Sequence, residues 1–206
     1  MGIASLPLEI QLILVPTIIF ELTFHEYAHA MVAYLLGDYT SYYQNRMNLN
    51  PFNHLDPFGT FALYFLGFGW AKPVPVLMQN LKNPKSDMMM IAMAGPASNM
   101  FLAMIASIIY RLNFYFQFSE EVIFPLEIFI QINIVLAIFN LLPLNPLDGS
   151  RILPLIVKNP RTLYNIEVYG PRVLIGLIIL NLIGIPILST IILTPVSIIF
   201  YLLTGA

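Results

Sequence analysis

The chain contains no cysteine and few charged residues, and both absences narrow what it can be. Without cysteine it can form no disulfide, and neither a nucleophile nor a metal ligand can be a thiolate, so a metal site must use nitrogen and oxygen donors. Only 10% of the 206 residues are charged, whereas about a quarter is usual for a soluble domain. Nine basic residues against eleven acidic ones, with no basic stripe, argue against a nucleic-acid partner.

Hydrophobic sequence fills the chain instead, at 58% of the residues and a mean hydropathy of +0.79. Four apolar runs are each near or above the ~20 residues that a helix needs to cross a bilayer, namely 8–36, 88–112, 122–143 and 172–203. The last run contains Pro186 and Pro195, so a kinked helix, two segments, or a span followed by a re-entrant turn all fit it. The first run has no basic leader and contains Glu9, which favours a retained span over a cleaved signal.

A fifth apolar stretch, residues 58–78, is interrupted by glycine and proline and is the predicted hairpin or re-entrant region; its 65–70 portion favours a hairpin or membrane-dipping loop over a helix. The sequence thus predicts one all-α polytopic membrane domain over residues 1–206. It would have about 4–6 transmembrane helices, with a membrane-associated hairpin or re-entrant loop after the first span. The lipid bilayer is its predicted surroundings, and the cell membrane (inner or plasma membrane) its predicted location.

The loops predict which way the chain crosses the membrane. Two lysines precede the second run, two glutamates precede the third, and four basic residues gather after it. The positive-inside rule then places the first and last of these loops in the cytosol and the amino terminus outside. These residues are, in order, Lys82, Lys85, Glu120, Glu121, Arg151, Lys158, Arg161 and Arg172.

The first run carries His25, Glu26 and His29, a His-Glu-x-x-His pattern. On a helix the two histidines share a face and can bind one Zn²⁺, while the glutamate activates the hydrolytic water. If the first span ends near residue 36, the motif lies about 10–16 Å below its cytosolic end at 1.5 Å per residue. In a soluble helix such a pattern is often accidental, but ionisable groups at membrane depth are costly and tend to be functional.

Catalytic zinc usually takes three protein ligands, and Asp148 is the best candidate for the third. It follows the third run, next to Gly149, where prolines interrupt the helix, and by the predicted topology it lies on the cytosolic side with the histidines. The alternative, that Asp148 caps a short helix over 149–157, is equally compatible with the sequence around it. The small residues Gly95, Ala97 and Ser98 are typical of closely packed helices.

Four motifs together resemble the site-2 protease family of intramembrane zinc metalloproteases. They span residues 25–149 and are His25-Glu26-x-x-His29, Asn50-Pro51-x-x-His54-x-Asp56-Pro57, Ala94-Gly95-Pro96-Ala97-Ser98-Asn99, and Asn140-x-x-Pro143-x-x-x-x-Asp148-Gly149. The resemblance implies that His25, His29 and Asp148 hold one zinc per chain and that Glu26 is the general base. It also implies a minimal member without PDZ or CBS domain, or a piece of a longer protein.

The resemblance further implies cleavage of transmembrane segments in membrane-anchored regulatory proteins, known as regulated intramembrane proteolysis. Asn140 and His54 are candidate catalytic residues, as second donors to the oxyanion. Asn140 could instead bond between helices, and His54 could anchor a loop or take part in substrate gating. Glu21, one turn before His25, could orient a ligand or merely pair within the membrane. A homo-oligomer or a regulatory membrane partner stays open.

The alternative function is a polytopic membrane metal-binding or transport protein without peptidase activity. A transporter would be expected to distribute its ligands along a translocation path rather than at one point. A catalytically silent membrane scaffold is a third reading.

Overall fold

Helices dominate the computed structural model, which describes residues 2–205. The α-helices are α1 (Leu8–Leu35), α2 (Thr40–Tyr43), α3 (Pro51–His54), α4 (Pro57–Leu66), α5 (Pro84–Phe116), α6 (Glu120–Asn140), α7 (Leu153–Ile156), α8 (Pro160–Leu182) and α9 (Ile187–Thr204). Three short 3-10 helices, η1 (Ile3–Ser5), η2 (Met78–Asn80) and η3 (Asp148–Ile152), complete the order. Within residues 2–205 the only β pairing is an isolated antiparallel bridge between Leu55 and Ala71.

Five helices of the described chain, α1, α5, α6, α8 and α9, are long and apolar enough to cross a membrane. This confirms the predicted all-α, multi-pass membrane protein. Of the readings left open for residues 172–203, the structure has two helices separated at residues 183–186. Gly184 takes a left-handed φ of 91° there, and Pro186 cannot continue the helix before it. The helix before the break begins at Pro160, earlier than predicted, because Asn159 caps it.

The region 58–78 is helical in its first half, and the helix reaches into the first two residues of the 65–70 portion that was predicted to be a hairpin or loop. Asp56 accepts a hydrogen bond from the Gly59 N–H and Pro57 takes the first helical position, and both features favour the start of α4. Gly67, with φ 76°, ends the helix and reverses the chain. Residues 68–77 then return in an extended conformation that passes along α4. The reversal that the glycines indicated is present, between a helix and an extended segment.

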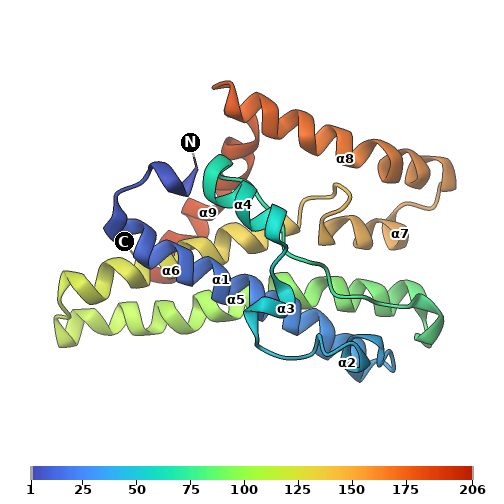
Figure 1. The fold of residues 1–206 in the computed structure, drawn as a ribbon, viewed down its shortest axis with the longest axis horizontal. Helices are drawn as coiled ribbons and strands as arrows, with labels where there is room; N and C mark the ends of the chain where they lie inside the picture. Colours follow the sequence, from blue (N-terminus) through green and yellow to red (C-terminus); the bar gives the residue numbers. More distant parts are fainter. Residues whose placement is uncertain (1, 206) are drawn as a thin grey trace.

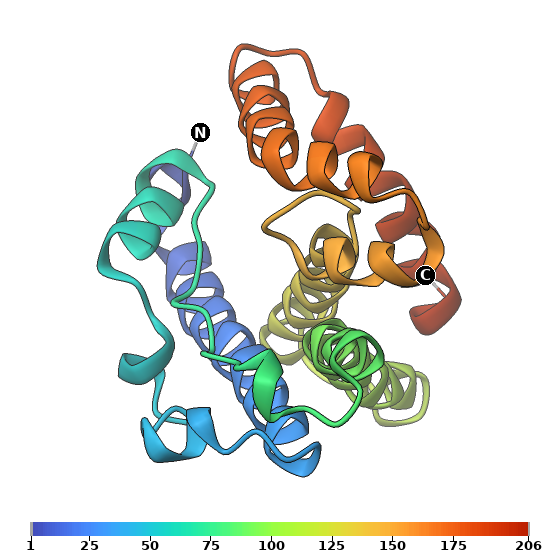
Figure 2. The same cartoon turned by 90° about the vertical axis from the view of Figure 1, so that its right-hand side faces the viewer.

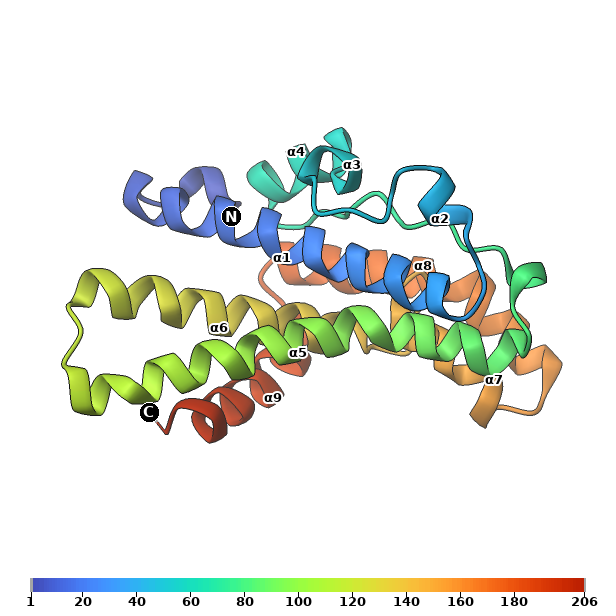
Figure 3. The same cartoon turned by 90° about the horizontal axis from the view of Figure 1, so that it is seen from below.

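The core of the molecule is a bundle in which α5 packs against α1 on one side and against α6 on the other (Figures 1 and 3). α9 packs against both α6 and α5. The buried side chains at this junction are small or branched and come from α5, α6 and α9, namely Ala103, Ala106, Ile130, Ile134, Leu188, Ile192 and Val196. Figure 2, which looks along the bundle, shows α4 and the extended segment on one side and α7 to α9 on the other.

Candidate metal centre and active site

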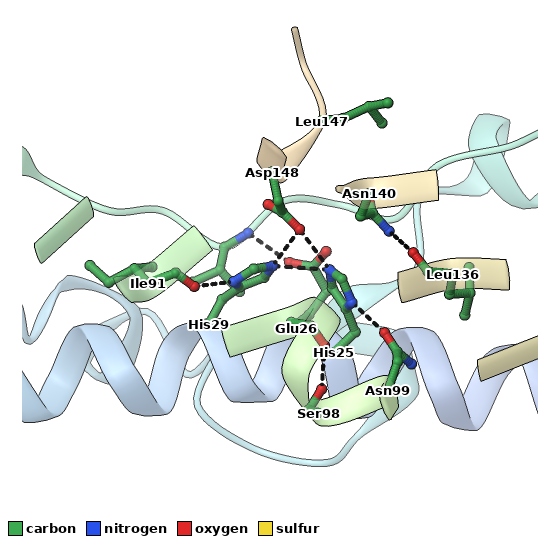
Figure 4. A network of polar contacts seen from close by, with 12 residues as sticks. His25, Glu26, His29, Ile91, Ser98, Asn99, Leu136, Asn140, Leu147 and Asp148 are labelled. Carbon is green, nitrogen blue, oxygen red and sulfur yellow. Dashed lines mark hydrogen bonds and ion pairs between the residues drawn. The ribbon is translucent and has the colours of Figure 1, made fainter. Parts of the chain in front are cut away.

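Three side chains converge between α1 and the segment that follows α6. His25 and His29 lie one turn apart on α1, and their Nε2 atoms are 3.0 Å from each other. The Oδ2 atom of Asp148, the first residue of η3, lies 3.2 Å from the His25 Nε2 and 3.3 Å from the His29 Nε2. Figure 4 shows the three side chains pointing toward one another. Two segments more than a hundred residues apart thus meet at one point, as the sequence predicted.

The hydrogen bonds behind the imidazoles fix which ring nitrogens face the centre as acceptors. The His29 Nδ1 donates to the carbonyl oxygen of Ile91 at 2.7 Å, and the His25 Nδ1 donates to the Asn99 Oδ1 at 2.6 Å. In the neutral rings both Nε2 atoms therefore carry lone pairs. The Asp148 Oδ2 is buried and forms no hydrogen bond. Three electron-pair donors that face one another at these distances could hold one metal ion.

The donor set fits Zn²⁺. Two ligands at the usual 2.0–2.1 Å from a tetrahedral zinc are roughly 3.3 Å apart, close to the three separations found here. Two nitrogens and one carboxylate oxygen are a common catalytic set, which leaves the fourth position open. In the described part of the chain no other group of three or more His, Cys, Asp or Glu residues lies close enough to hold a metal.

The glycine Gly95 lets α5 approach these imidazoles. A Cβ atom at Gly95 would stand 2.4 Å from the His25 Nε2 and 2.5 Å from the His29 Nε2, which no real contact allows. The close helix approach that the small residues predicted is therefore an approach to the two imidazoles themselves. Any side chain at this position would displace the rings.

The Asp148-Gly149 pair is held by a similar close approach. A Cβ at Gly149 would lie 2.2 Å from the carbonyl oxygen of Leu141, just beyond the end of α6. The 3-10 helix η3 packs against α5 and points Asp148 at the histidines. Leu147 is the N-cap residue of η3, and Asp148 forms no capping bond, so the capping role that the sequence left open is not observed.

Glu26 lies beside the imidazoles without joining the three converging ligand atoms (Figure 4). It is 9% exposed, and its Oε2 accepts a hydrogen bond of 3.1 Å from the backbone N–H of Val74. Val74 belongs to the extended segment, which is anchored on its other side. The buried Arg46 donates to the Lys72 carbonyl at 2.6 Å, and Ser41 donates to the Pro75 carbonyl. The extended segment thus fixes one carboxylate oxygen and leaves the other facing the site.

Two charged side chains near the site, Arg46 and Asp148, have shifted pKa values. Burial lowers the pKa of the Arg46 guanidinium, partly offset by the nearby Glu26 carboxylate. Burial raises the pKa of the Asp148 carboxyl, but the contacts with the two imidazoles lower it by more, so the pKa lies well below its ordinary value. An ionised Asp148 is the form that binds a cation.

The two further candidate catalytic residues, Asn140 and His54, do not point into the group formed by His25, His29 and Asp148. Asn140 lines the cavity, but its Nδ2 donates to the carbonyl of Leu136 within its own helix. His54 is fully buried outside the cavity, and its Nε2 donates to the Asn48 carbonyl at 2.7 Å. Burial lowers the pKa of His54, which keeps the ring neutral. Its catalytic role stays a prediction, while its contacts are those of a loop anchor.

A cavity of about 390 Å³ contains the site. Its wall is mostly apolar and comes from α1, α5, α6 and α8, from residues 68–76, and from the segment 146–151 that carries Asp148. Arg151, which is exposed, lines it beside Asp148. Across the cavity the Phe68 and Phe139 rings meet edge to face with centroids 6.1 Å apart. Such a space suits a narrow, largely apolar chain with one hydrolysable bond at the metal.

Sequence reasoning gave no role to several residues that surround the ligands. Asn99 bonds His25, Asn133 bonds Asn99, and the Val74 N–H bonds Glu26. Asn133 could have been singled out, because an amide in the middle of an apolar span needs a partner. Val74 could not, because its contribution is a backbone group.

Comparison with known proteins agrees with this site. The profile of peptidase family M50 matches residues 115–183, which include Asn140 and Asp148. A protein of Bacillus subtilis (strain 168) named "Putative zinc metalloprotease YwhC" is 45% identical over 153 residues, covering 71% of this chain and 70% of that protein. No solved structure gives a significant match.

Proposed function

This chain belongs to peptidase family M50, the site-2 proteases, and we propose that it cleaves peptide bonds inside the transmembrane segments of membrane-anchored regulatory proteins. Family membership makes it a zinc metalloprotease, and its five apolar helices make it a multi-pass membrane protein. The observation that carries the proposal is the convergence of His25, His29 and Asp148 beside Glu26, all within a membrane bundle.

The chain's own residues can perform hydrolysis. When bound by His25, His29 and Asp148, zinc supplies Lewis-acid polarisation and lowers the pKa of water toward about 7. The Glu26 carboxylate, held by Val74, takes the proton of the attacking water and later passes it to the leaving amine. Asn140 is the proposed second donor to the oxyanion, which requires its Nδ2 to leave the Leu136 carbonyl and turn toward the cavity.

The extended segment is the proposed place where substrate binds. Val74 and Val76 line the cavity, and within residues 2–205 neither the Val74 carbonyl nor the Val76 N–H has a hydrogen-bond partner. These two groups are spaced so that one residue of an extended peptide can bond both, by β-augmentation. A transmembrane helix shields its own peptide bonds, so local unwinding onto this edge exposes the bond to be cut. Recognition through the backbone requires little sequence specificity.

The proposed orientation places the site nearer the cytosol of the cell membrane. Seven of the nine basic residues lie in the α1–α5 and α6–α8 connections or in the first two residues of the helix that follows, namely Arg46, Lys72, Lys82, Lys85, Arg151, Lys158 and Arg161. Their clustering favours a cytosolic position for both connections. The cavity beside Arg151 then provides the path by which water and products exchange. The proposal also includes a first cut of the substrate by another protease and a regulatory membrane partner.

Metal transport is the alternative, and the structure offers less support for it. Transport sites are expected at several points along a path. The described residues instead form one cluster of three ligands with a carboxylate at hand to act as base.

Cleavage of a synthetic transmembrane peptide in lipid vesicles tests the function. We expect products that end inside the membrane segment, as located by mass spectrometry. Chelation should abolish the cleavage, because no metal ion then remains at the three residues to polarise the water. Adding back one Zn²⁺ per chain should restore it. Cleavage that continues after the metal is removed, or zinc transport without any cleavage, would contradict the proposal.

Val76→Pro tests the substrate edge, because it removes the free N–H. We expect kcat/KM for the peptide to fall about five- to tenfold, the size of one lost backbone hydrogen bond, while the zinc content is unchanged. Val76→Ala is the matched control, since it shortens the side chain but keeps the N–H, and it should stay within about twofold of wild type. Equal kinetics for the proline and alanine variants would remove this edge from the binding site.

A further inference from the structure

A chain of polar side chains leads away from His25 on the side opposite Asp148. The His25 Nδ1 contacts the Asn99 Oδ1 at 2.6 Å, and the Asn99 Nδ2 donates to the Asn133 Oδ1 at 3.1 Å. The Asn133 Nδ2 donates in turn to the Glu21 Oε1 at 2.6 Å. The chain therefore joins α1, α5 and α6 and returns to α1 one turn before the ligand. Glu21, Asn99 and Asn133 are all 0% exposed.

These contacts have one direction. Each carboxamide uses its oxygen toward His25 and its nitrogen toward Glu21, and the Asn133 nitrogen also donates to the Phe129 carbonyl. Reversing either amide would set donor against donor. The end of the chain must consequently be an acceptor, and Glu21 provides it. The oxygen of Glu21 fixes Asn133, Asn133 fixes Asn99, and Asn99 then offers only an oxygen to the His25 Nδ1–H.

Packing alone does not explain a glutamate at this place. A carboxyl group at membrane depth is costly, and leucine would fill a similar volume without that cost. The Oε2 of Glu21 is buried and has no hydrogen-bond partner, and the residue forms no ion pair with the described part of the chain. The one contact for which its chemistry is needed is the acceptance of the Asn133 hydrogen bond.

We propose that Glu21 is a positioning residue for the metal ligand His25, acting through Asn133 and Asn99. This inference rests on the proposed zinc site. A hydrogen bond from the Nδ1–H keeps the ring in the tautomer whose Nε2 lone pair faces the metal and increases the basicity of that nitrogen. Two asparagines, Asn133 and Asn99, stand between Glu21 and the His25 ring in this relay of hydrogen bonds. Loss of the Glu21 acceptor therefore lets both amides and the imidazole turn.

Zinc affinity of the purified protein, measured by competition with a chelator, tests the relay. Glu21→Leu should weaken Zn²⁺ binding about 10–100-fold, the usual effect of losing an outer partner of a metal-bound histidine. Glu21→Gln should remain within about threefold of wild type, because the amide oxygen can accept the same hydrogen bond. The matched control is Glu127→Leu, another carboxyl in a span, whose Oε1 accepts from the Tyr110 hydroxyl; it should bind zinc like wild type.

A double variant separates the relay from general damage. Asn133→Leu interrupts the same chain one step nearer His25, and it carries the same expectation if Glu21→Leu does not fold. Combined, Glu21→Leu and Asn133→Leu should lose no more affinity than either alone, because one break already disconnects the chain. Additive losses, wild-type affinity in folded Glu21→Leu, or an equal loss in Glu127→Leu would overturn the relay. Failure of the wild-type protein to bind Zn²⁺ would instead overturn the zinc site itself.

Discussion

Glu26→Gln is expected to abolish cleavage of the transmembrane peptide while the protein keeps its zinc. General acid–base catalysis contributes about 10²–10⁴-fold, and a neutral amide can neither take nor return the proton. Glutamine has nearly the same shape and retains an oxygen for the Val74 N–H, so the extended segment should stay in place. The measurements are the cleavage rate in vesicles and the metal content of the same preparation.

The control for this variant is Glu127→Gln, which neutralises a carboxylate elsewhere in a span and should cleave at the wild-type rate. The pair also separates the three functions that the sequence allowed. Loss of cleavage with zinc retained identifies the protease. If wild type and both variants transport zinc equally and none of them cleaves the peptide, the transporter is favoured. If none of the three proteins transports zinc or cleaves the peptide, the scaffold is favoured. Substantial cleavage by Glu26→Gln would remove Glu26 as the base.

The three side chains that converge at the candidate metal site could be predicted from sequence because the chemistry restricts the choice strongly. Three histidines in the whole chain, two of them four residues apart in a span, leave few ways to bind a metal without cysteine. Asp148 followed from its position after a span and beside a glycine, and the structure brings its carboxylate to both imidazoles. The helical spacing of the two histidines and their position within an apolar run are local features, so they can be recognised in a single sequence.

What could not be predicted depends on contacts between distant segments. The support of Glu26 comes from a backbone N–H in an irregular stretch, and no side-chain pattern marks it. The first half of the region 58–78 folds as a helix because the cap at Asp56 and the turn at Gly67 bracket ten residues whose one proline, Pro57, takes the first helical position, where proline is tolerated. The break that the glycines and prolines predicted is present from Gly67 onward, and only the first two residues of the 65–70 portion belong to the helix.

Asp148→Asn is expected to remove most of the zinc. Asp148 is the one anionic ligand among the three, and its buried Oδ2 has no other partner to hold it. Asparagine keeps the shape but loses the charge, and its amide can turn its nitrogen toward the metal. We expect the affinity for Zn²⁺ to fall by more than about 100-fold, because losing even an outer partner of a ligand costs 10–100-fold. Cleavage should fall in proportion to the zinc lost.

The matched control for Asp148→Asn is Asp56→Asn. Asp56 caps α4 through the Gly59 N–H, and asparagine caps a helix about as well, so this variant should keep both zinc and activity. The zinc contents of the two variants and of wild type therefore separate the effect of losing the Asp148 charge from the effect of losing a carboxylate elsewhere in the chain. Wild-type zinc content in Asp148→Asn would take Asp148 out of the ligand set. Since two histidines alone would then hold the cation, the third donor would have to be sought among Glu26 and the other residues that line the cavity.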